Sequence, residues 1–344
     1  MFIPLILTFS LKGEGTKSLN LMTLIRPPLL KPHLMINDQN QQSSRYSSQV
    51  VKPGNNLPAK FPYFTPWLFI FTLIWLVAYW FAFPDPLGLA ASNWPLIIVG
   101  VAGAFIGNVT AIGGGIVFIP VLMLAYNIDP VSALKLAFVT QAVGMTSGAS
   151  GWLRRGEVPL SLLKWTVPAL IIGAVVSTFL IHPQPMLIKG LFGPIAFIAG
   201  LLVLITLERK GGRPVLPANA LIPVMLISFL GGLITGWVAI GEGEIIAAFC
   251  MLAYGLDANR AIGLGVVLLS INSILLALIH SFYFGGVPWE LAAFTMLGVL
   301  WGGRLGPFLA QWISMRTTKK VFAFIALLDG MVIILQTSYV MFFR

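Results

Sequence analysis

Two hydrophobic stretches of this chain are near-copies of one another, and glycines interrupt both. Residues 111–129 read AIGGGIVFIPVLMLAYNID and residues 239–257 read AIGEGEIIAAFCMLAYGLD, so nine of nineteen positions are identical at an offset of 128. With one inserted residue, the match continues from residues 156–159 to residues 285–288. Duplicated hydrophobic units with a glycine-rich interruption are typical of transporters. We therefore predict a molecule built from two related halves.

The composition places the chain in a membrane. It is 58% hydrophobic and 9% charged, whereas a soluble domain is roughly 25% charged. The apolar residues come in runs of about 20, the length that crosses a bilayer. We predict an all-α polytopic protein of the cytoplasmic (inner) membrane, with the lipid bilayer as a partner. Basic cytoplasmic loops explain the net charge of +10, so no nucleic acid is expected to bind.

The apolar runs predict the order of the spans. Residues 1–65 are predicted to form a disordered cytoplasmic tail, because the stretch 37–60 is rich in Asn, Gln and Ser. An extra N-terminal transmembrane helix is predicted over 66–83, before repeat 1 (94–207) and repeat 2 (217–342). Within the repeats the apolar runs are 94–126, 131–152, 160–181, 187–207, 217–254, 261–283, 289–312 and 320–342.

The first run of each repeat is too long for one helix. A straight helix over 94–126 would measure roughly 50 Å, at about 1.5 Å per residue, against a hydrocarbon core of about 30 Å. The glycines at 113–115 and 241–243 are the natural breaks. We predict that each run enters the membrane, unwinds at its glycines and returns. Each repeat then holds one broken re-entrant helical hairpin and three transmembrane helices.

The loop charges favour opposite orientations for the repeats. The links 84–93, 182–186 and 284–288 lack Lys and Arg, and returning hairpins put all of them outside. The tail and the basic clusters then fall inside, the clusters being Arg154 and Arg155, then Arg209, Lys210 and Arg213, then Arg316, Lys319 and Lys320. The N-terminus is therefore predicted inside and the repeats inverted, with a shared site at the midplane. The alternative is a plain duplication into two parallel domains without a shared site.

Two carboxylates distinguish the copies. Glu242 and Glu244 stand where the first copy has Gly114 and Ile116. A carboxylate near the bilayer midplane costs about 2.5 kcal/mol or more, so such residues usually face a polar interior. We predict that both serve in proton coupling, with ligation of a coupling cation as a second reading. The structural alternatives are a surface pair at the hairpin mouth and a salt bridge to Arg260 or Arg304.

Residues around the breaks are candidates for substrate binding. Unwound backbone inside a membrane must be buried in protein or line a wet cavity, and the positive end of a helix that starts there suits an anion. The alternative is that the glycines let helices pack closely and that the polar side chains join helices. The substrate-binding candidates are Thr110, Gly113, Gly114, Gly115, Thr140, Gln141, Gly241, Gly243, Ser270 and Asn272.

No pattern in the chain indicates catalysis. The sequence lacks HExxH, CxxC, GxSxG and P-loop motifs. We therefore predict neither an enzyme nor a cofactor, metal or catalytic site. The single cysteine, Cys250, excludes an intrachain disulfide. Without a nucleotide-binding motif, active transport would be driven by an ion gradient or by the substrate.

With these motifs the chain resembles the TauE/SafE sulfite-exporter family of membrane permeases. The resemblance covers residues 94–340 and is carried by AIGGGI at 111–116 with Pro120, by Ala133 after Pro130, by RRGEV at 154–158, and by the weaker second copy. It implies transport of small anions such as sulfite or organosulfonates across the cytoplasmic membrane. The second motif departs from the pattern at Glu242 and Glu244 and has Ala248 in place of Pro120. These departures bear on the substrate more than on the fold.

Together the residues and the resemblance predict a secondary transporter that exports small anions, with proton coupling. A passive anion channel, or an importer of small organic solutes on the same scaffold, is the alternative. An intramembrane enzyme or assembly factor would need a titratable constellation that the sequence does not show. The pattern is compatible with a homo-oligomer.

Overall fold

The computed structural model describes residues 66–180, 185–206, 212–309 and 314–343. Across these ranges the chain is helical, and the backbone pairs in β fashion only at an isolated bridge between Arg213 and Leu256. The predicted all-α class is therefore confirmed for the described chain. The predicted tail, residues 1–65, lies outside the described residues.

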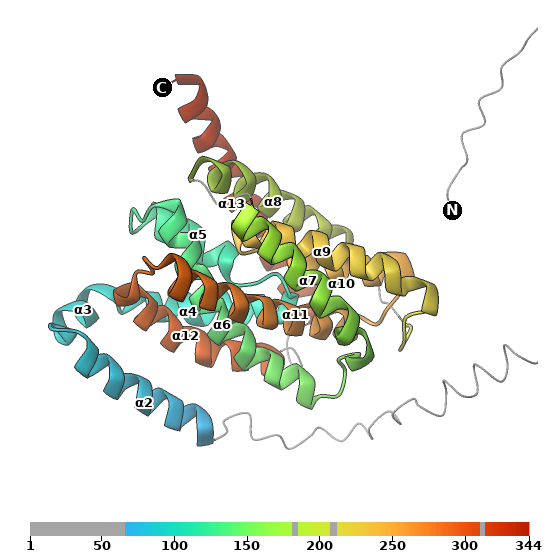
Figure 1. The fold of residues 1–344 in the computed structure, drawn as a ribbon, viewed down its shortest axis with the longest axis horizontal. Helices are drawn as coiled ribbons and strands as arrows, with labels where there is room; N and C mark the ends of the chain where they lie inside the picture. Colours follow the sequence, from blue (N-terminus) through green and yellow to red (C-terminus); the bar gives the residue numbers. More distant parts are fainter. Residues whose placement is uncertain (1–65, 181–184, 207–211, 310–313, 344) are drawn as a thin grey trace, which may run out of the picture. The chain divides into compact units, whose positions relative to one another are not determined.

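The helices match the predicted runs, with the breaks in the predicted places (Figure 1). Both long runs are split, one between residues 110 and 115 and the other between residues 238 and 242. Repeat 1 contains α4 (Pro95–Thr110), α5 (Gly115–Leu124), α6 (Pro130–Arg154), α7 (Leu160–Leu180) and α8 (Pro185–Thr206). Repeat 2 contains the short η2 (Ala218–Ala220), α9 (Leu221–Val238), α10 (Glu242–Tyr254), α11 (Ala258–Leu278), η3 (Ile279–Phe284), α12 (Trp289–Leu309) and α13 (Met315–Phe343).

The leading segment is more elaborate than the single predicted helix. Helix α2 (Pro66–Ala82) fills the predicted span 66–83, and α3 (Pro86–Asn93) follows it at an angle of 118°. The pair forms the bent blue segment of Figure 1. Asp85 caps α3 by accepting a hydrogen bond from the Gly88 amide, and Pro86 occupies the first helical position, where proline is favoured. The link 84–93, which lacks Lys and Arg, is thus largely helical.

The two repeats contact each other by exchanging helices. Helix α4 of repeat 1 packs on α12 of repeat 2, and α9 of repeat 2 packs on α7 of repeat 1. Helices α6 and α11 pack together, as do α8 and α13. Single glycines permit both exchanged contacts, because a Cβ at Gly302 would collide with the Val101 carbonyl and one at Gly173 with the Phe229 carbonyl. These are matched positions of the two copies, so the repeats are related in structure as well as in sequence.

Matched aspartates start the helix after each break. The Asp129 carboxylate accepts hydrogen bonds from the backbone amides of Val131 and Ser132, at 3.1 and 3.0 Å. In repeat 2 the Asp257 carboxylate does the same for Asn259 and Arg260, at 3.0 and 3.4 Å. Aspartate is a preferred N-cap residue because it satisfies otherwise unpaired amides of the first turn. The caps fix where α6 and α11 begin.

Helix length and composition identify three described helices able to cross a membrane, namely Leu160–Leu180, Ala218–Val238 and Ala258–Phe284. Counting the bent pair α2–α3 as one span makes four. Helix α6 has 25 residues but carries many polar side chains, among them Thr140, Gln141 and Ser147, which are buried in the molecule. Such inner helices are less apolar because neighbouring helices, rather than lipid, surround them.

Candidate functional site

The two glycine breaks have the same backbone conformation. Ala111 directly follows α4 and Ala239 directly follows α9, and both alanines are left-handed, with φ of 65° and 56°. Two residues later Gly113 and Gly241 have φ of 94° and 97°. Residues with a Cβ rarely adopt such angles, so glycine is needed at these two positions. We call residues 111–115 and 239–243 the first and second tips.

The two tips meet. The Gln141 side-chain amide of α6 donates a 2.6 Å hydrogen bond to the carbonyl oxygen of Ala239 in the second tip. The Gly241 amide of the second tip is 3.5 Å from the Ile112 carbonyl of the first. A Cβ at Gly243 would collide with the Ala111 carbonyl. The predicted residues Gln141, Gly241 and Gly243 therefore lie at one junction between the repeats.

Glu242 is buried at this junction. Its side chain has no exposed surface. The carboxylate oxygen Oε2 accepts a hydrogen bond from the Asn272 side-chain amide of α11. Its other oxygen, Oε1, has no hydrogen-bond partner among the described residues. The structure thus brings together two of the predicted site residues, Glu242 and Asn272.

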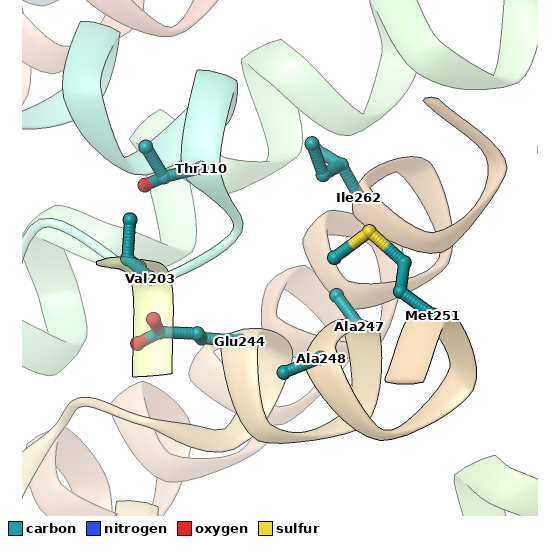
Figure 2. A pocket seen from close by; sticks show the side chains of 7 residues that line it. All are labelled: Thr110, Val203, Glu244, Ala247, Ala248, Met251 and Ile262. Atoms are coloured by element: carbon teal, nitrogen blue, oxygen red, sulfur yellow. The ribbon is translucent and has the colours of Figure 1, made fainter. Parts of the chain in front are cut away.

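Glu244 lines a cavity with a residue of the other repeat. Its side chain is 3% exposed, and it borders the cavity together with Thr110, the last residue of α4. In Figure 2 the Glu244 carboxyl and the Thr110 hydroxyl both point toward the side that Val203 of α8 borders. The rest of the wall is apolar and comes from Ala247, Ala248, Met251 and Ile262. Glu244 and Thr110 are the polar side chains of this wall.

The cavity is very small. It measures about 10 Å³, and a cavity needs roughly 10–15 Å³ to hold one water molecule. An anion of several heavy atoms does not fit in it as it stands.

Two other predicted residues join helices. The Thr140 and Thr295 hydroxyls are 2.9 Å apart and link α6 to α12. The Ser270 and Thr146 hydroxyls are also 2.9 Å apart and link α11 to α6. Both contacts agree with the structural alternative for these side chains.

The first-tip glycines lie close to repeat 2 as well. A Cβ at Gly113 would come within 2.9 Å of the Leu269 side chain, and one at Gly115 within 2.7 Å of the Gln141 amide. A Cβ at Gly114 would instead meet the ring of Phe118 in its own repeat. The compact first tip therefore leaves no room for a side chain at residues 113–115.

Two further polar residues of repeat 2 lie at the junction. The Ser273 hydroxyl donates to Gln141 Oε1 at 3.2 Å and so orients its amide. The Thr235 hydroxyl is 3.4 Å from the Ile240 carbonyl of the second tip. It is also a hydrogen-bonding neighbour of the Glu242 carboxyl. Ser270 and Ser273 lie one turn of helix apart, with Asn272 beside Ser273, and this spacing indicates a polar face on α11.

The electrostatics of the tips are unequal. Helix α10 carries Glu242 and Glu244 in its first turn, whereas α5 has no acidic residue there. Carboxylates are stabilised near the positive end of a helix dipole. The N-terminus of α10, at the second tip, therefore carries two acidic side chains. The N-terminus of α5, at the first tip, carries none.

Both structural alternatives for the acidic pair are wrong in this structure. The pair is not at the surface, because both side chains are buried. The Arg260 guanidinium donates to the Pro214 carbonyl at 2.9 Å. Arg304 donates instead to the Ser150 hydroxyl at 2.8 Å and lies near the Ser147 carbonyl. Neither arginine pairs with a glutamate of α10.

The chain is similar in sequence to known membrane transporters. Residues 96–333 match the family described as sulfite exporter TauE/SafE. The probable membrane transporter protein YjnA of Bacillus subtilis (strain 168) is 25% identical over 258 residues, which cover 70% of this chain and 98% of that protein. The probable membrane transporter protein YunE of the same organism is 20% identical over 259 residues, covering 68% and 94% respectively. No solved structure matches the chain.

Proposed function

Because the chain belongs to the TauE/SafE sulfite exporter family of multi-pass membrane transporters, which is not an enzyme family, we propose that it exports a small anion by secondary transport. Sulfite and organosulfonates are the proposed substrates. The substrate crosses at the junction of the two tips, and the acidic pair of α10 couples its movement to protons. The observation that carries this proposal is that Glu244 and Thr110, from different repeats, line one buried cavity.

The proposal includes inverted repeats. The exchanged helix contacts support a two-fold relation between the halves, and the loop charges support opposite orientations. Such an arrangement places a site at the bilayer midplane, where rocking of one half against the other exposes it to each side in turn. The small volume of the cavity, about 10 Å³, supports this mode of transport over a passive channel, which needs a continuous path.

Proton coupling resolves an electrostatic conflict. Two ionised carboxylates in a low-dielectric site would repel an anionic substrate strongly. Protonation within the acidic pair removes part of that repulsion and supplies a hydrogen-bond donor. The Thr110 hydroxyl, which now donates to the Ile106 carbonyl at 2.8 Å, lies on the same cavity wall.

The test is sulfite flux into proteoliposomes that contain the full chain. We expect radiolabelled sulfite to exchange across the bilayer, and a pH gradient to drive its accumulation. In Glu244→Gln the exchange rate should fall at least about tenfold, equivalent to about 1.4 kcal/mol, because the cavity loses its titratable group. Glu290→Gln, at an exposed residue of α12, is the matched control and should behave as wild type. Absence of flux for sulfite and for small sulfonates would overturn the proposal.

A further inference from the structure

A polar cluster near the second tip has no counterpart near the first. Thr235, Glu242 and Asn272 lie together in repeat 2, whereas the offset of 128 places Gly107, Gly114 and Gly144 at the matched positions of repeat 1. All three polar side chains are fully buried. The duplicated scaffold therefore holds a polar site in one half, and glycines replace it in the other.

The match of Asn272 to Gly144 depends on where repeat 2 gained its extra residue, and a π-helix marks that place. The offset is 128 up to Asp257 and 129 at Gly285, so repeat 2 has gained one residue in between. The structure shows a π-helix, η3, over Ile279–Phe284, directly after α11. A π-turn is the usual way in which a helix takes in a single extra residue. The insertion therefore lies beyond Asn272, and Asn272 matches Gly144.

Gly231 of α9 packs closely against Glu242. The position that a Cβ would take on Gly231 of α9 lies 3.3–3.5 Å from the Cα, Cβ and Cγ atoms of Glu242, in ordinary to tight contact. Asn272 reaches Glu242 from α11 and donates to its Oε2, and Thr235 acts on the carboxyl from α9. Three helices of the same repeat thus enclose one carboxyl group.

The cluster contains no positive charge. The side chains that hydrogen-bond with the Glu242 carboxyl are the neutral groups of Asn272 and Thr235. Helix α9 contributes no titratable side chain, and Arg260 of α11 donates to the Pro214 carbonyl. Besides Glu242, α10 carries Glu244, Cys250 and, at its far end, Tyr254. An isolated buried carboxylate is very costly, and such a group neutralises itself unless a partner compensates it.

The cluster also has unused hydrogen-bonding capacity. Glu242 Oε1 and Asn272 Oδ1 have no hydrogen-bond partner among the described residues. A protonated carboxyl is a donor as well as an acceptor, and a side-chain amide offers both an NH₂ donor and a carbonyl acceptor. Asn272 can therefore serve either protonation state, by donating to the carboxylate or by accepting from the carboxylic acid.

From these observations we infer that Glu242, held by Asn272 and Thr235, is the proton-binding site of this transporter, distinct from the cavity residue Glu244. This inference rests on the proposed function and divides its acidic pair into two roles. A proton from one side forms an O–H bond with the Glu242 carboxylate, and the same bond breaks when the proton leaves to the other side. Asn272 and Thr235 are positioning residues, because they act through Glu242.

The first test needs no transport. In nanodiscs, infrared difference spectra between acidic and alkaline buffer should show the C=O stretching band of a buried carboxylic acid. We expect Glu242→Gln to abolish this band and Asn272→Ala to shift it, because the acid loses its hydrogen-bond partner. Glu244→Gln is the matched control and should retain it. Persistence of the band in Glu242→Gln, or its loss in Glu244→Gln instead, would overturn the inference.

The second test separates coupling from transport. In proteoliposomes the readout is the ratio of pH-driven sulfite accumulation to sulfite exchange without a gradient. We expect Glu242→Gln to lose the response to the gradient and Asn272→Ala to move its pH profile, with Glu290→Gln as the unaffected control. If Glu242→Gln still follows the gradient, the inference is wrong while the proposed function stands. If no variant and no wild-type protein moves sulfite, the proposed function fails, and the infrared result still decides whether Glu242 binds the proton.

Discussion

At the scale of single residues, Gly243 is a position where the second tip tolerates no side chain. A Cβ there would collide with the carbonyl oxygens of Ala111 in the first tip and Gly265 in α11. Backbone atoms cannot rotate away as side chains can, so the tips would have to separate. The close contact between the two tips therefore requires glycine at position 243.

We therefore expect Gly243→Ala to destabilise the protein by about 1–3 kcal/mol, the usual cost of overpacking a well-packed interior. Thermal unfolding in detergent, followed by tryptophan fluorescence, measures the loss. Gly190→Ala in α8 is the matched control, since a Cβ there meets nothing within 4 Å, and alanine favours the helix by up to about 1 kcal/mol. Equal stability of Gly243→Ala and wild type would show that the tips are not packed as described.

The sequence identifies the residues of the junction better than their partners. Glu242, Glu244 and the glycines stand out because a carboxylate or a helix breaker inside an apolar run is unusual. Ser273 and Thr295 do not stand out, because a hydroxyl in a membrane helix often bonds to its own backbone. Which side chain meets which depends on the rotation of each helix about its axis, and an isolated sequence does not contain that angle.

At the scale of helices, the aspartate caps decide where the spans after the tips begin. Asp129 is partly exposed outside the membrane-spanning helices. Partial burial alone would raise the pKa of its carboxyl, but hydrogen bonds from Ser132 and Val131 and the charge of Lys135 hold that pKa below its ordinary value of 3.8. A carboxyl with a lowered pKa stabilises the folded state above its ordinary pKa, and that stabilisation is lost as the pH falls further.

The pH dependence of Asp129→Asn tests this cap. Asparagine keeps a side-chain oxygen for capping but cannot titrate. We expect the difference in unfolding temperature between wild type and Asp129→Asn to be constant at neutral pH and to shift against the wild type below pH 3.8. Asp85→Asn, which removes a charge from the cap of α3, controls for general effects of charge. A difference that does not change with pH would contradict the assigned role.

Helix length predicts the two breaks, but local sequence does not predict the bends around them. The break at 111–114 follows from a run that is too long and from three consecutive glycines. Helix α3 was not predicted, because its residues 86–93 look like a short loop rich in small residues. The π-turn of η3 becomes visible only when the two copies are compared, since one extra residue in a long apolar run leaves no local mark.

At the scale of the whole molecule, the account depends on how two copies of one unit combine. The repeats exchange helices across their interface, Gln141 of repeat 1 donates a hydrogen bond to the Ala239 carbonyl of the second tip, and repeat 2 alone carries the acidic pair. In the transport mechanism that we propose, a shared scaffold with a single titratable half would give one coupling site for each substrate site. That proposal depends on an opposite orientation of the two halves.

The most direct measurement of that step is paired cysteine labelling. Ser161 at the start of α7 and Glu290 at the start of α12 are matched positions at an offset of 129, and both are exposed. Each is replaced by cysteine in a Cys250→Ala background, and intact cells receive a membrane-impermeant maleimide. Inverted repeats predict that Glu290→Cys is labelled from outside and that Ser161→Cys is labelled only after permeabilisation. Labelling of both positions from the same side would contradict the account.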